Sequence, residues 1–238
     1  MAVLPCYFQA MDPITTGVYQ VSGYSRSFII DGDEGVTLVD TGMPGRQAAI
    51  IDVLQSIGRS AKDVNTIVIT HSHADHTGGA AVLKGETGAL LYASAVEAPA
   101  VRGEERAPQP PFLDKVPFLK PLFRLVPGAD GVEVDHLIAE NGGTVLPEDL
   151  RVIDTPGHTP GHVSFLLDRN GGVLFVGDAA VATKAGEVKR GFMNRSTATF
   201  DNSLRHMAEF EFDIACFGHS EALRGSAASA FKRLGASL

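Results

Sequence analysis

The chain has 238 residues, of which 44% are hydrophobic and 20% charged, which is the composition of an ordinary globular protein. Its net charge of −8 argues against nucleic acid as a partner, because such binding depends on clustered Lys and Arg that neutralise phosphates. With only two cysteines, a disulfide framework is not expected, and this favours a reducing cytoplasm. No signal peptide and no apolar run of membrane-spanning length is evident, so we expect one domain over residues 1–238 without a membrane partner.

The first third of the chain is predicted to form strands and then a helix. Three short apolar or alternating runs lie between turn-forming residues, at 17–21, 27–30 and 36–39. Their spacing favours an antiparallel meander. Asp40 follows the third run directly, a position that is also typical of a turn-forming Asp. Apolar residues then recur at helical spacing, which predicts an amphipathic helix over residues 44–57 that ends at Gly58.

A cluster of three histidines and one aspartate follows a strand predicted at 66–69, and its members are His71, His73, Asp75 and His76. In an extended segment, residues two apart point the same way, so His71 and His73 can reach one ion together. Asp75 and His76 come where the chain must turn, and can face a second ion. Imidazole and carboxylate ligands suit zinc but also iron, nickel and manganese, so the residues predict a metal site without fixing the metal.

Two Pro-Gly turns surround a further histidine, in Thr155-Pro-Gly-His158-Thr-Pro-Gly-His162. Because such turns hold the backbone rigidly, we expect His158 to be the third ligand of the first metal. His162 enters a strand predicted at 163–167, and we expect it to support the loop rather than to bind an ion.

Two more predicted strands end in residues of types that can bind metals. Residues 172–178 form an apolar strand that ends in Gly-Asp, and a carboxylate at Asp178 can bridge two ions. Residues 213–219 form another strand, which ends at His219. Most of the candidate residues thus lie just beyond the C-terminal ends of strands, where open α/β sheets tend to bind ligands. The other predicted elements are strands at 89–92, 132–138 and 150–153 and helices at 80–83, 200–210 and 221–234.

A proline-rich apolar insertion at about 99–127 interrupts this pattern. Its prolines exclude a long regular helix, while its apolar residues are too frequent for a disordered linker. Two roles stay open, a lid over the binding site or the interface of a homodimer. In the first role, the insertion would form a pocket wall for a substrate with an apolar portion, through Phe112, Phe118, Leu119, Leu122 and Phe123.

The motifs Thr-His-x-His-x-Asp-His, Thr-Pro-Gly-His-Thr-Pro-Gly-His, Gly-Asp and Gly-His together resemble those of the metallo-β-lactamase superfamily, and they run from Asp40 to His219. The resemblance implies an α/β fold in the form of a four-layer αββα sandwich, in which two mixed β-sheets are flanked by helices. It also implies two divalent metal ions at one edge, with Zn2+ expected and Fe or Mn as alternatives. The implied roles are His71, His73 and His158 for metal one, Asp75, His76 and His219 for metal two, Asp178 as the bridge, and Asp40 as a support through hydrogen bonds.

The resemblance further implies hydrolysis by a hydroxide that bridges the two metals, with Asp178 and Asp75 as catalytic residues and Asp75 passing a proton to the leaving group. Because the fold does not name the substrate, we expect an ester-like bond in a small molecule, in a lactone, ester or thioester. Many lactonases of the family place a tyrosine shortly after the bridging aspartate, and residues 179–183 contain none. The alternatives are an iron-dependent redox enzyme similar to persulfide dioxygenases, a phosphodiesterase, or a metal-binding module without turnover.

Overall fold

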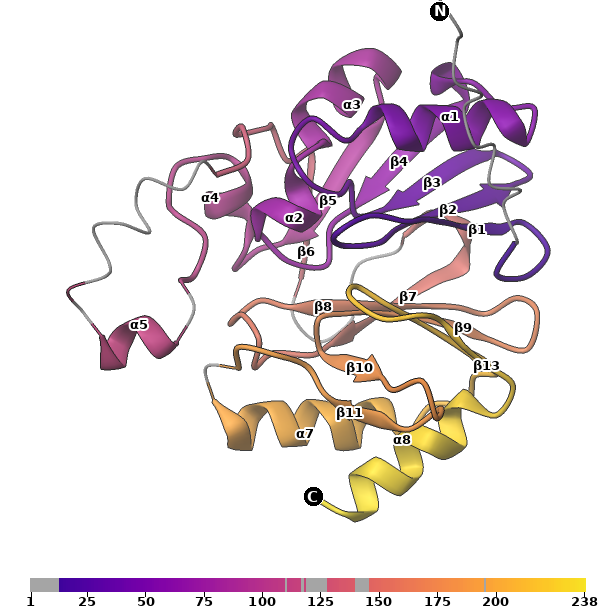
Figure 1. Ribbon diagram of the computed structural model, residues 1–238. Helices are drawn as coiled ribbons and strands as arrows, with labels where there is room; N and C mark the ends of the chain where they lie inside the picture. Colours follow the sequence, from indigo (N-terminus) through magenta and orange to yellow (C-terminus); the bar gives the residue numbers. More distant parts are fainter. Residues whose placement is uncertain (1–12, 110, 117, 119–127, 140–145, 195) are drawn as a thin grey trace, which may run out of the picture.

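The computed structural model describes residues 13–109, 111–116, 118, 128–139, 146–194 and 196–238. Two β-sheets lie face to face in the middle of the molecule, and helices cover the outer side of each (Figure 1). The helices α1 (Ala48–Ser56) and α3 (Ala80–Thr87) cover one sheet, and α7 (Thr197–Met207) and α8 (Ala227–Ala236) cover the other. This is the predicted αββα sandwich.

The first sheet has the strand order β1-β2-β3-β4-β5-β6. Its strands are β1 (Val18–Val21), β2 (Ser27–Gly32), β3 (Gly35–Val39), β4 (Val64–Val68), β5 (Leu90–Ser94) and β6 (His136–Ile138). The strands β1 to β3 pair antiparallel, which confirms the predicted meander, and β3 to β6 pair parallel. Short helices α2 (Ala74–Thr77), α4 (Ala98–Val101) and α5 (Phe112–Lys115) lie in the connections.

The second sheet has the order β13-β12-β9-β8-β7. Its strands are β7 (Leu150–Asp154), β8 (Val163–Leu167), β9 (Val173–Gly177), β12 (Ile214–Phe217) and β13 (Leu223–Arg224). Only β9 and β12 pair parallel, so this sheet is mixed as well. A separate hairpin of β10 (Ala180–Ala182) and β11 (Val188–Arg190) follows the end of β9, and the sequence analysis did not predict it.

Alternation of side chains along the strands divides the apolar residues into three layers. On β2, Phe28 and Ile30 face the second sheet and pack in one cluster with Phe165 and Phe175. Ile29, between them in the sequence, faces the opposite side and packs in the cluster that includes Leu54 of α1. A third cluster fills the space between the second sheet and the helices α7 and α8. The sheets are therefore held face to face by a continuous apolar layer, which fixes the edge where their loops meet.

Two helices begin later than predicted. The helix predicted at 44–57 starts at Ala48, because Gly45 has a φ of 75° and Arg46 N–H closes a turn onto the carbonyl of Met43. The helix predicted at 221–234 starts at Ala227, because β13 first pairs with β12.

The strand predicted at 132–138 is also shorter than expected, since β6 covers only His136–Ile138. Val132 N–H donates to the carbonyl of Val101 in α4, and the Asp135 side chain accepts the N–H of Leu91. Asp135 N–H also donates to the carbonyl of Leu91, so the segment reaches β5 at Asp135 and pairs with it as a strand from His136.

The insertion at 99–127 is described only in part. Its helix α5 stands apart from the two sheets (Figure 1), and beside it Phe118 is 76% exposed. Leu113 of α5 is buried. Of the residues expected to form a pocket wall, Leu119, Leu122 and Phe123 lie outside the described residues, as does the side chain of Phe112. The lid and the interface both stay predictions.

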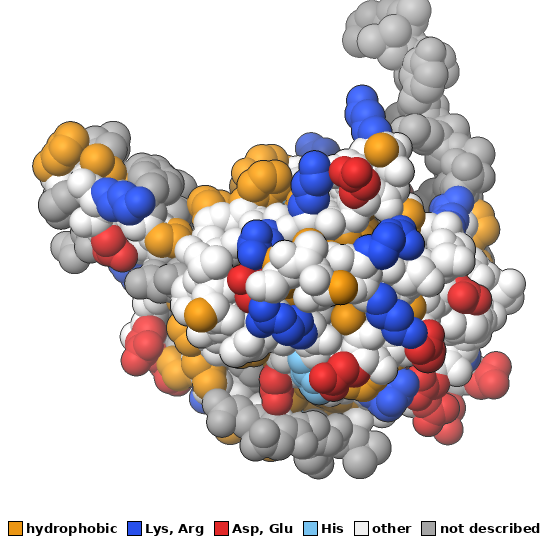
Figure 2. Space-filling view, turned by 90° about the horizontal axis from the view of Figure 1, so that it is seen from below, with side chains coloured by type: hydrophobic (Ala, Val, Ile, Leu, Met, Phe, Trp, Pro, Cys, Tyr) orange, Lys and Arg blue, Asp and Glu red, His pale blue; other side chains and the backbone are white. Residues whose placement is uncertain are grey.

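The face formed by α7 and α8 carries charges of both signs. Figure 2 shows Lys and Arg side chains interspersed with Asp and Glu on this side of the molecule, and hydrophobic side chains on the projecting segment around α5. Such mixing gives no concentrated positive field on this face. Within the described ranges, no helix is both long enough and apolar enough to span a membrane.

Candidate metal centre

The candidate site lies at one edge of the sandwich, where strands from both sheets end. Asp40 follows β3, the segment 71–76 follows β4, and Asp178 follows β9. His158 lies in the loop after β7, and His219 lies just after β12. The sequence placed these residues after separate strands, and the structure brings all of them together.

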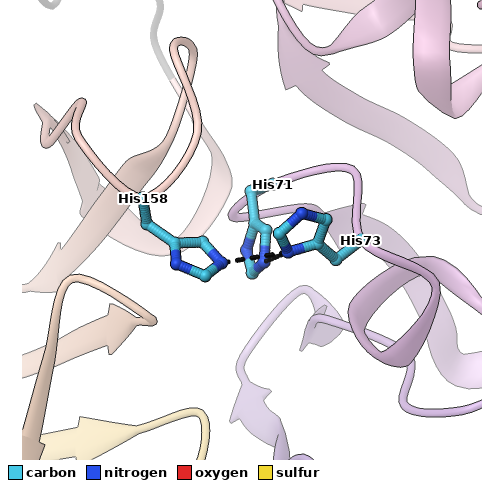
Figure 3. A group of neighbouring side chains, drawn as sticks. All are labelled: His71, His73 and His158. Carbon is cyan, nitrogen blue, oxygen red and sulfur yellow. Dashed lines mark hydrogen bonds between the residues drawn. The ribbon is translucent and has the colours of Figure 1, made fainter. Parts of the chain in front are cut away.

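Three histidines point their ring nitrogens at one another (Figure 3). The Nδ1 of His73 lies 3.1 Å from Nε2 of His71 and 2.9 Å from Nε2 of His158. His71 and His158 are buried, and His73 is half-buried. The set therefore offers three nitrogen atoms to one point, which is the number of protein ligands that a catalytic zinc site uses.

The hydrogen-bond partners of the outer ring nitrogens indicate which nitrogen of each histidine carries the proton. His73 Nε2 faces the carbonyl oxygen of Pro108 at 2.9 Å, and His158 Nδ1 faces that of Phe192 at 2.8 Å. A carbonyl oxygen can only accept, so both outer nitrogens carry the proton. The hydroxyl of Thr70 donates to Asp40, and it therefore accepts from His71 Nδ1, 3.1 Å away.

It follows that the three facing nitrogens all carry lone pairs in the neutral rings. Lone pairs about 3 Å apart repel one another unless a cation lies between them. The residues present therefore fit a metal ion with the three-histidine set as its ligands. His71, His73 and His158 are the residues predicted to bind the first metal, and their role as ligands stays a prediction.

A second set of ligand atoms adjoins the first and consists of Asp75, His76 and His219. His76 Nδ1 lies 2.7 Å from an oxygen of Asp40, which leaves Nε2 as its free atom. The Oδ2 atom of Asp75 lies 3.7 Å from that Nε2 and 3.2 Å from Nε2 of His219. His219 Nδ1 donates to the carbonyl of Tyr24 at 3.0 Å.

Asp178 lies between the two sets. Its Oδ2 is 3.4 Å from Nε2 of His158 and 3.3 Å from Nε2 of His219, and its Oδ1 is 3.3 Å from Nε2 of His76. The Oδ1 of Asp178 and the Nε2 of His76 are buried, and apart from their 3.3 Å contact with each other, which is not aligned as a hydrogen bond, neither has a hydrogen-bond partner among the described residues. Buried polar atoms without partners are rare, and a metal ligand is a common explanation for them. Both atoms face the space between the sets.

Burial and charge set the protonation of the first group of histidines. Burial lowers the pKa of His158 to about 4. Burial, with repulsion from His76 and His73, lowers the pKa of His71 well below its ordinary value. Near pH 7 these imidazoles are neutral, which is the state in which histidine binds a metal.

The carboxylates shift the second group in the opposite direction. Burial lowers the pKa of His219, but hydrogen bonds to Asp178 and Asp75 outweigh it and raise the pKa to about 9. Burial is likewise outweighed at His76, where Asp178 and Asp40 raise the pKa well above its ordinary value. Conversely, burial raises the pKa of Asp178, but the neighbouring histidines bring it well below the usual range. Ionised carboxylates therefore lie between imidazoles that they stabilise in the protonated, positively charged form.

Asp40 lies next to His76 and contacts the start of the histidine segment. One of its oxygens accepts the N–H of Thr70 at 2.8 Å, and the other accepts the Thr70 hydroxyl at 2.8 Å and His76 Nδ1. Its φ of 58° lies in the left-handed region, which is unusual for a residue with a side chain and is common at functional sites. Asp40 thus fixes both His76 and the start of the histidine segment. Thr70, which the sequence analysis assigned no role, completes this contact.

His162 lies beside the ligand atoms but is not aimed at them. Its Nε2 accepts the backbone N–H of Asp178 at 3.0 Å, and its Nδ1 faces the Thr155 hydroxyl at 2.8 Å. The ring packs so closely that a Cβ at Gly177 would lie 2.6 Å from its Nε2, and Gly177 also has a φ of 57°. His162 therefore contacts the backbone of Asp178 directly, and its predicted role as a support stays a prediction.

A cleft of about 340 Å3 adjoins the second set of ligands. It is lined by the turn at 21–25, the turn at 41–46 and α1, with Tyr24, Met43 and Arg46 among the lining residues. The Tyr24 ring stands edge-on to the His219 ring, with centroids 5.3 Å apart. No sequence pattern indicates this cleft, because two turns far apart in the chain form it.

Residues 22–219 match the family model of the metallo-beta-lactamase superfamily. The chain belongs to this superfamily. It is 30% identical over 160 residues to a hydroxyacylglutathione hydrolase of Albidiferax ferrireducens, covering 66% of this chain and 49% of that protein. The chain therefore spans about half the length of that relative.

Two further comparisons cover a larger share of the length of the other protein. An N-acyl homoserine lactonase from a Bacillus species is 26% identical over 220 residues, covering 81% of this chain and 79% of the lactonase. The crystal structure of a metallo-beta-lactamase family protein from Thermus thermophilus has a TM-score of 0.68 at 24% identity, covering 94% of this chain and 80% of that chain. The structural likeness bears on the fold alone.

Proposed function

We propose that the chain is a metal-dependent hydrolase of an ester-like bond in a small molecule, in a lactone, ester or thioester. The observation that carries this proposal is the convergence of three imidazole lone pairs and an unpartnered buried carboxylate oxygen at one edge of the sandwich. Relatives named as a hydroxyacylglutathione hydrolase and an N-acyl homoserine lactonase support the same class of reaction.

The proposed site holds two divalent ions, with zinc as the first candidate and iron or manganese as alternatives. Neutral imidazoles together with carboxylates are ligands that suit zinc. In this proposal, seven residues bind the ions: His71, His73 and His158 bind one, Asp75, His76 and His219 bind the other, and Asp178 contacts both. When bound, the ions supply a hydroxide from water near neutral pH and polarise the carbonyl oxygen of the substrate.

The residues of the chain have two tasks in this scheme, which are to orient the side chains of the site and to move a proton. Asp40 and His162 keep His76 and Asp178 in fixed orientations through the hydrogen bonds described above. Burial raises the pKa of Asp75, but the hydrogen bond from His219 and the positive charge of His76 outweigh it and lower the pKa, so Asp75 is ionised. Its side chain is 19% exposed, so it can take up a proton and pass it to the leaving group at the open side of the site.

The cleft beside His219 is the proposed place for the part of the substrate that does not react. Its walls combine apolar side chains such as Met43 with hydroxyls from Ser25 and Tyr24, which is the usual character of a small-molecule site. Arg46 is exposed, and its guanidinium has no hydrogen bond or ion pair among the described residues. An acidic group on the substrate would therefore find a free cation there.

A panel of esters, thioesters and lactones, assayed with protein of measured metal content, tests the proposal. We expect turnover by the wild type and none by Asp178→Ala, which keeps its fold because Asp178 lies at the sheet edge rather than within an apolar layer. Circular dichroism checks the fold of the variant. Near-normal turnover by Asp178→Ala would exclude the bridging role. Turnover of persulfides only by an iron-loaded form, or of phosphodiesters alone, would replace the ester-like substrate with one of the alternatives.

A further inference from the structure

Glu97 is a buried carboxylate that lies outside the proposed ligand set and contacts two loops at once. It follows β5 and directly precedes α4, and it is 2% exposed. One oxygen accepts the backbone N–H of Ser72 at 3.0 Å and also the Ser72 hydroxyl. The other oxygen accepts the backbone N–H of Gly161 at 2.9 Å. Each oxygen of Glu97 is thus bound to a different loop.

The two loops carry the histidines of the first set. Ser72 stands between His71 and His73, in the segment that leaves β4 of the first sheet. Gly161 follows His158 by three residues, in the loop between β7 and β8 of the second sheet. The carboxylate of Glu97 therefore joins the two sheets at the place where their histidines meet.

The packing around this contact leaves little room for adjustment. A Cβ at Gly161 would lie 2.7 Å from the hydroxyl oxygen of Ser94 and 3.0 Å from Cγ of Glu97. A glycine is therefore required for the loop to approach so closely. The Glu97 N–H in turn donates to Ser94, with 3.1 Å to its carbonyl oxygen and 3.2 Å to its hydroxyl oxygen.

A need for stability alone does not explain a carboxylate at this position. Among the described residues, no cation pairs with Glu97, and its donors are neutral groups. A buried acidic group without a cation costs free energy that an apolar residue of similar size would avoid. What a carboxylate offers is two acceptor oxygens at a fixed separation, one for each loop.

We propose that Glu97 is a positioning residue, which sets the separation of the two loops and thereby the approach of His158 to His71 and His73. The inference rests on the proposed metal-binding role of these three histidines. It adds that their convergence depends on a residue between β5 and α4, remote in sequence from both histidine motifs.

Hydrogen exchange followed by mass spectrometry tests the contact itself, independently of any activity. Glu97→Gln keeps the size of the side chain but replaces one acceptor oxygen with a donor, so one loop must lose its bond. The matched control is Asp135→Asn, which removes a carboxylate that likewise accepts a backbone N–H, that of Leu91 at 2.7 Å, but contacts neither histidine loop. We expect faster exchange at 70–73 or 158–162 in Glu97→Gln only. Unchanged exchange in both loops would overturn the proposal.

Metal affinity, measured by competition with a chelating dye, separates positioning from a general structural role. We expect Glu97→Gln to bind metal about 10-fold more weakly at the first set, in the range seen when groups that orient ligands are removed. Asp135→Asn should match the wild type. An equal loss in both variants would make Glu97 merely structural and would overturn the proposal. Absence of metal binding by the wild type would instead contradict the proposed function, while the exchange experiment still decides the contact.

If Glu97→Gln does not fold, Ser72→Ala takes its place, since it removes the hydroxyl bond to Glu97 and keeps the backbone bonds. We then expect a smaller loss of metal affinity in the same direction, together with faster exchange at 70–73. No change in either quantity would contradict the role of Glu97.

Discussion

The ring of His162 accepts a hydrogen bond from the backbone N–H of Asp178, with 3.0 Å between the two nitrogens. This contact fixes the tautomer, because Nε2 accepts and Nδ1 must then donate to Thr155. The Thr155 hydroxyl then donates a hydrogen bond to the Ser164 hydroxyl, and the Ser164 hydroxyl donates to the carbonyl of Val176. Burial lowers the pKa of His162 well below its ordinary value, so the ring stays neutral and the chain of bonds keeps its direction.

His162→Ala should therefore weaken the site without removing a ligand. The variant leaves the N–H of Asp178 buried without an acceptor, which costs about 1–3 kcal/mol in the free energy of unfolding. We also expect lower metal content, since Asp178 loses its support. Urea unfolding and elemental analysis measure the two effects, with His206→Ala on the exposed side of α7 as the control. A His162→Ala protein with wild-type stability and metal content would show that the contact has no role.

Arg46→Gln should affect only substrates with an acidic group. Because Arg46 is exposed, its attraction for a carboxylate contributes roughly 0.2–1 kcal/mol, which predicts a KM about 1.4- to 5-fold higher for an acidic ester. A neutral ester of the same length should show an unchanged KM. Arg233→Gln, at an exposed arginine of α8, serves as the control. Equal effects on both esters would place the acidic group elsewhere.

Phe118→Ala tests the role of the insertion. The carbonyl of Pro108 faces His73, so the insertion reaches the first set of ligands before it extends to α5. If it forms a pocket wall, the loss of kcat/KM should grow with the length of the acyl chain, since each buried methylene contributes about 0.8 kcal/mol. Equal losses at all chain lengths, or none together with a change from dimer to monomer, would assign the insertion to a subunit interface.

Cys216 should be inert in the folded protein. It lies buried in β12, within the apolar layer between the sheets, and burial raises the pKa of its thiol. The thiolate is the reactive form, so iodoacetamide at pH 8 should leave Cys216 unmodified until the protein is unfolded in urea. Peptide mass spectrometry reads out the labelling. Rapid modification of the native protein would mean that the apolar layer opens readily.

The sequence was sufficient for the residues whose chemistry and local spacing coincide. His71, His73 and Asp75 lie within five residues, and the Pro-Gly turns mark His158, so these positions could be predicted from short segments. Most strands of the two sheets followed from apolar runs, whereas β10, β11 and β13 were not predicted. Boundaries were less predictable where another contact replaced the helical one. At Arg46 a turn onto Met43 precedes α1, and at Leu223 a short strand pairs with β12 before α8 begins.

Other features depend on residues that meet only in the folded chain. Glu97 stands in an ordinary Ala-Val-Glu-Ala segment, and only the fold reveals that it contacts both histidine loops. The cleft beside Tyr24 likewise combines two distant turns. The contact of Glu97 arises where the two sheets meet, and the cleft arises where turns of the first sheet pack beside α1. No periodicity or motif represents either feature.

The number of metal ions per chain tests the central claim most directly. Elemental analysis of protein purified without a chelator should give about two equivalents of metal for the wild type. The three imidazoles of the first set suffice for one ion, and the three residues of the second set suffice for another, when both share Asp178. His219→Ala should reduce the value to about one, since it removes a ligand of the second set alone. A wild-type value of one that His219→Ala leaves unchanged would contradict the two-metal site.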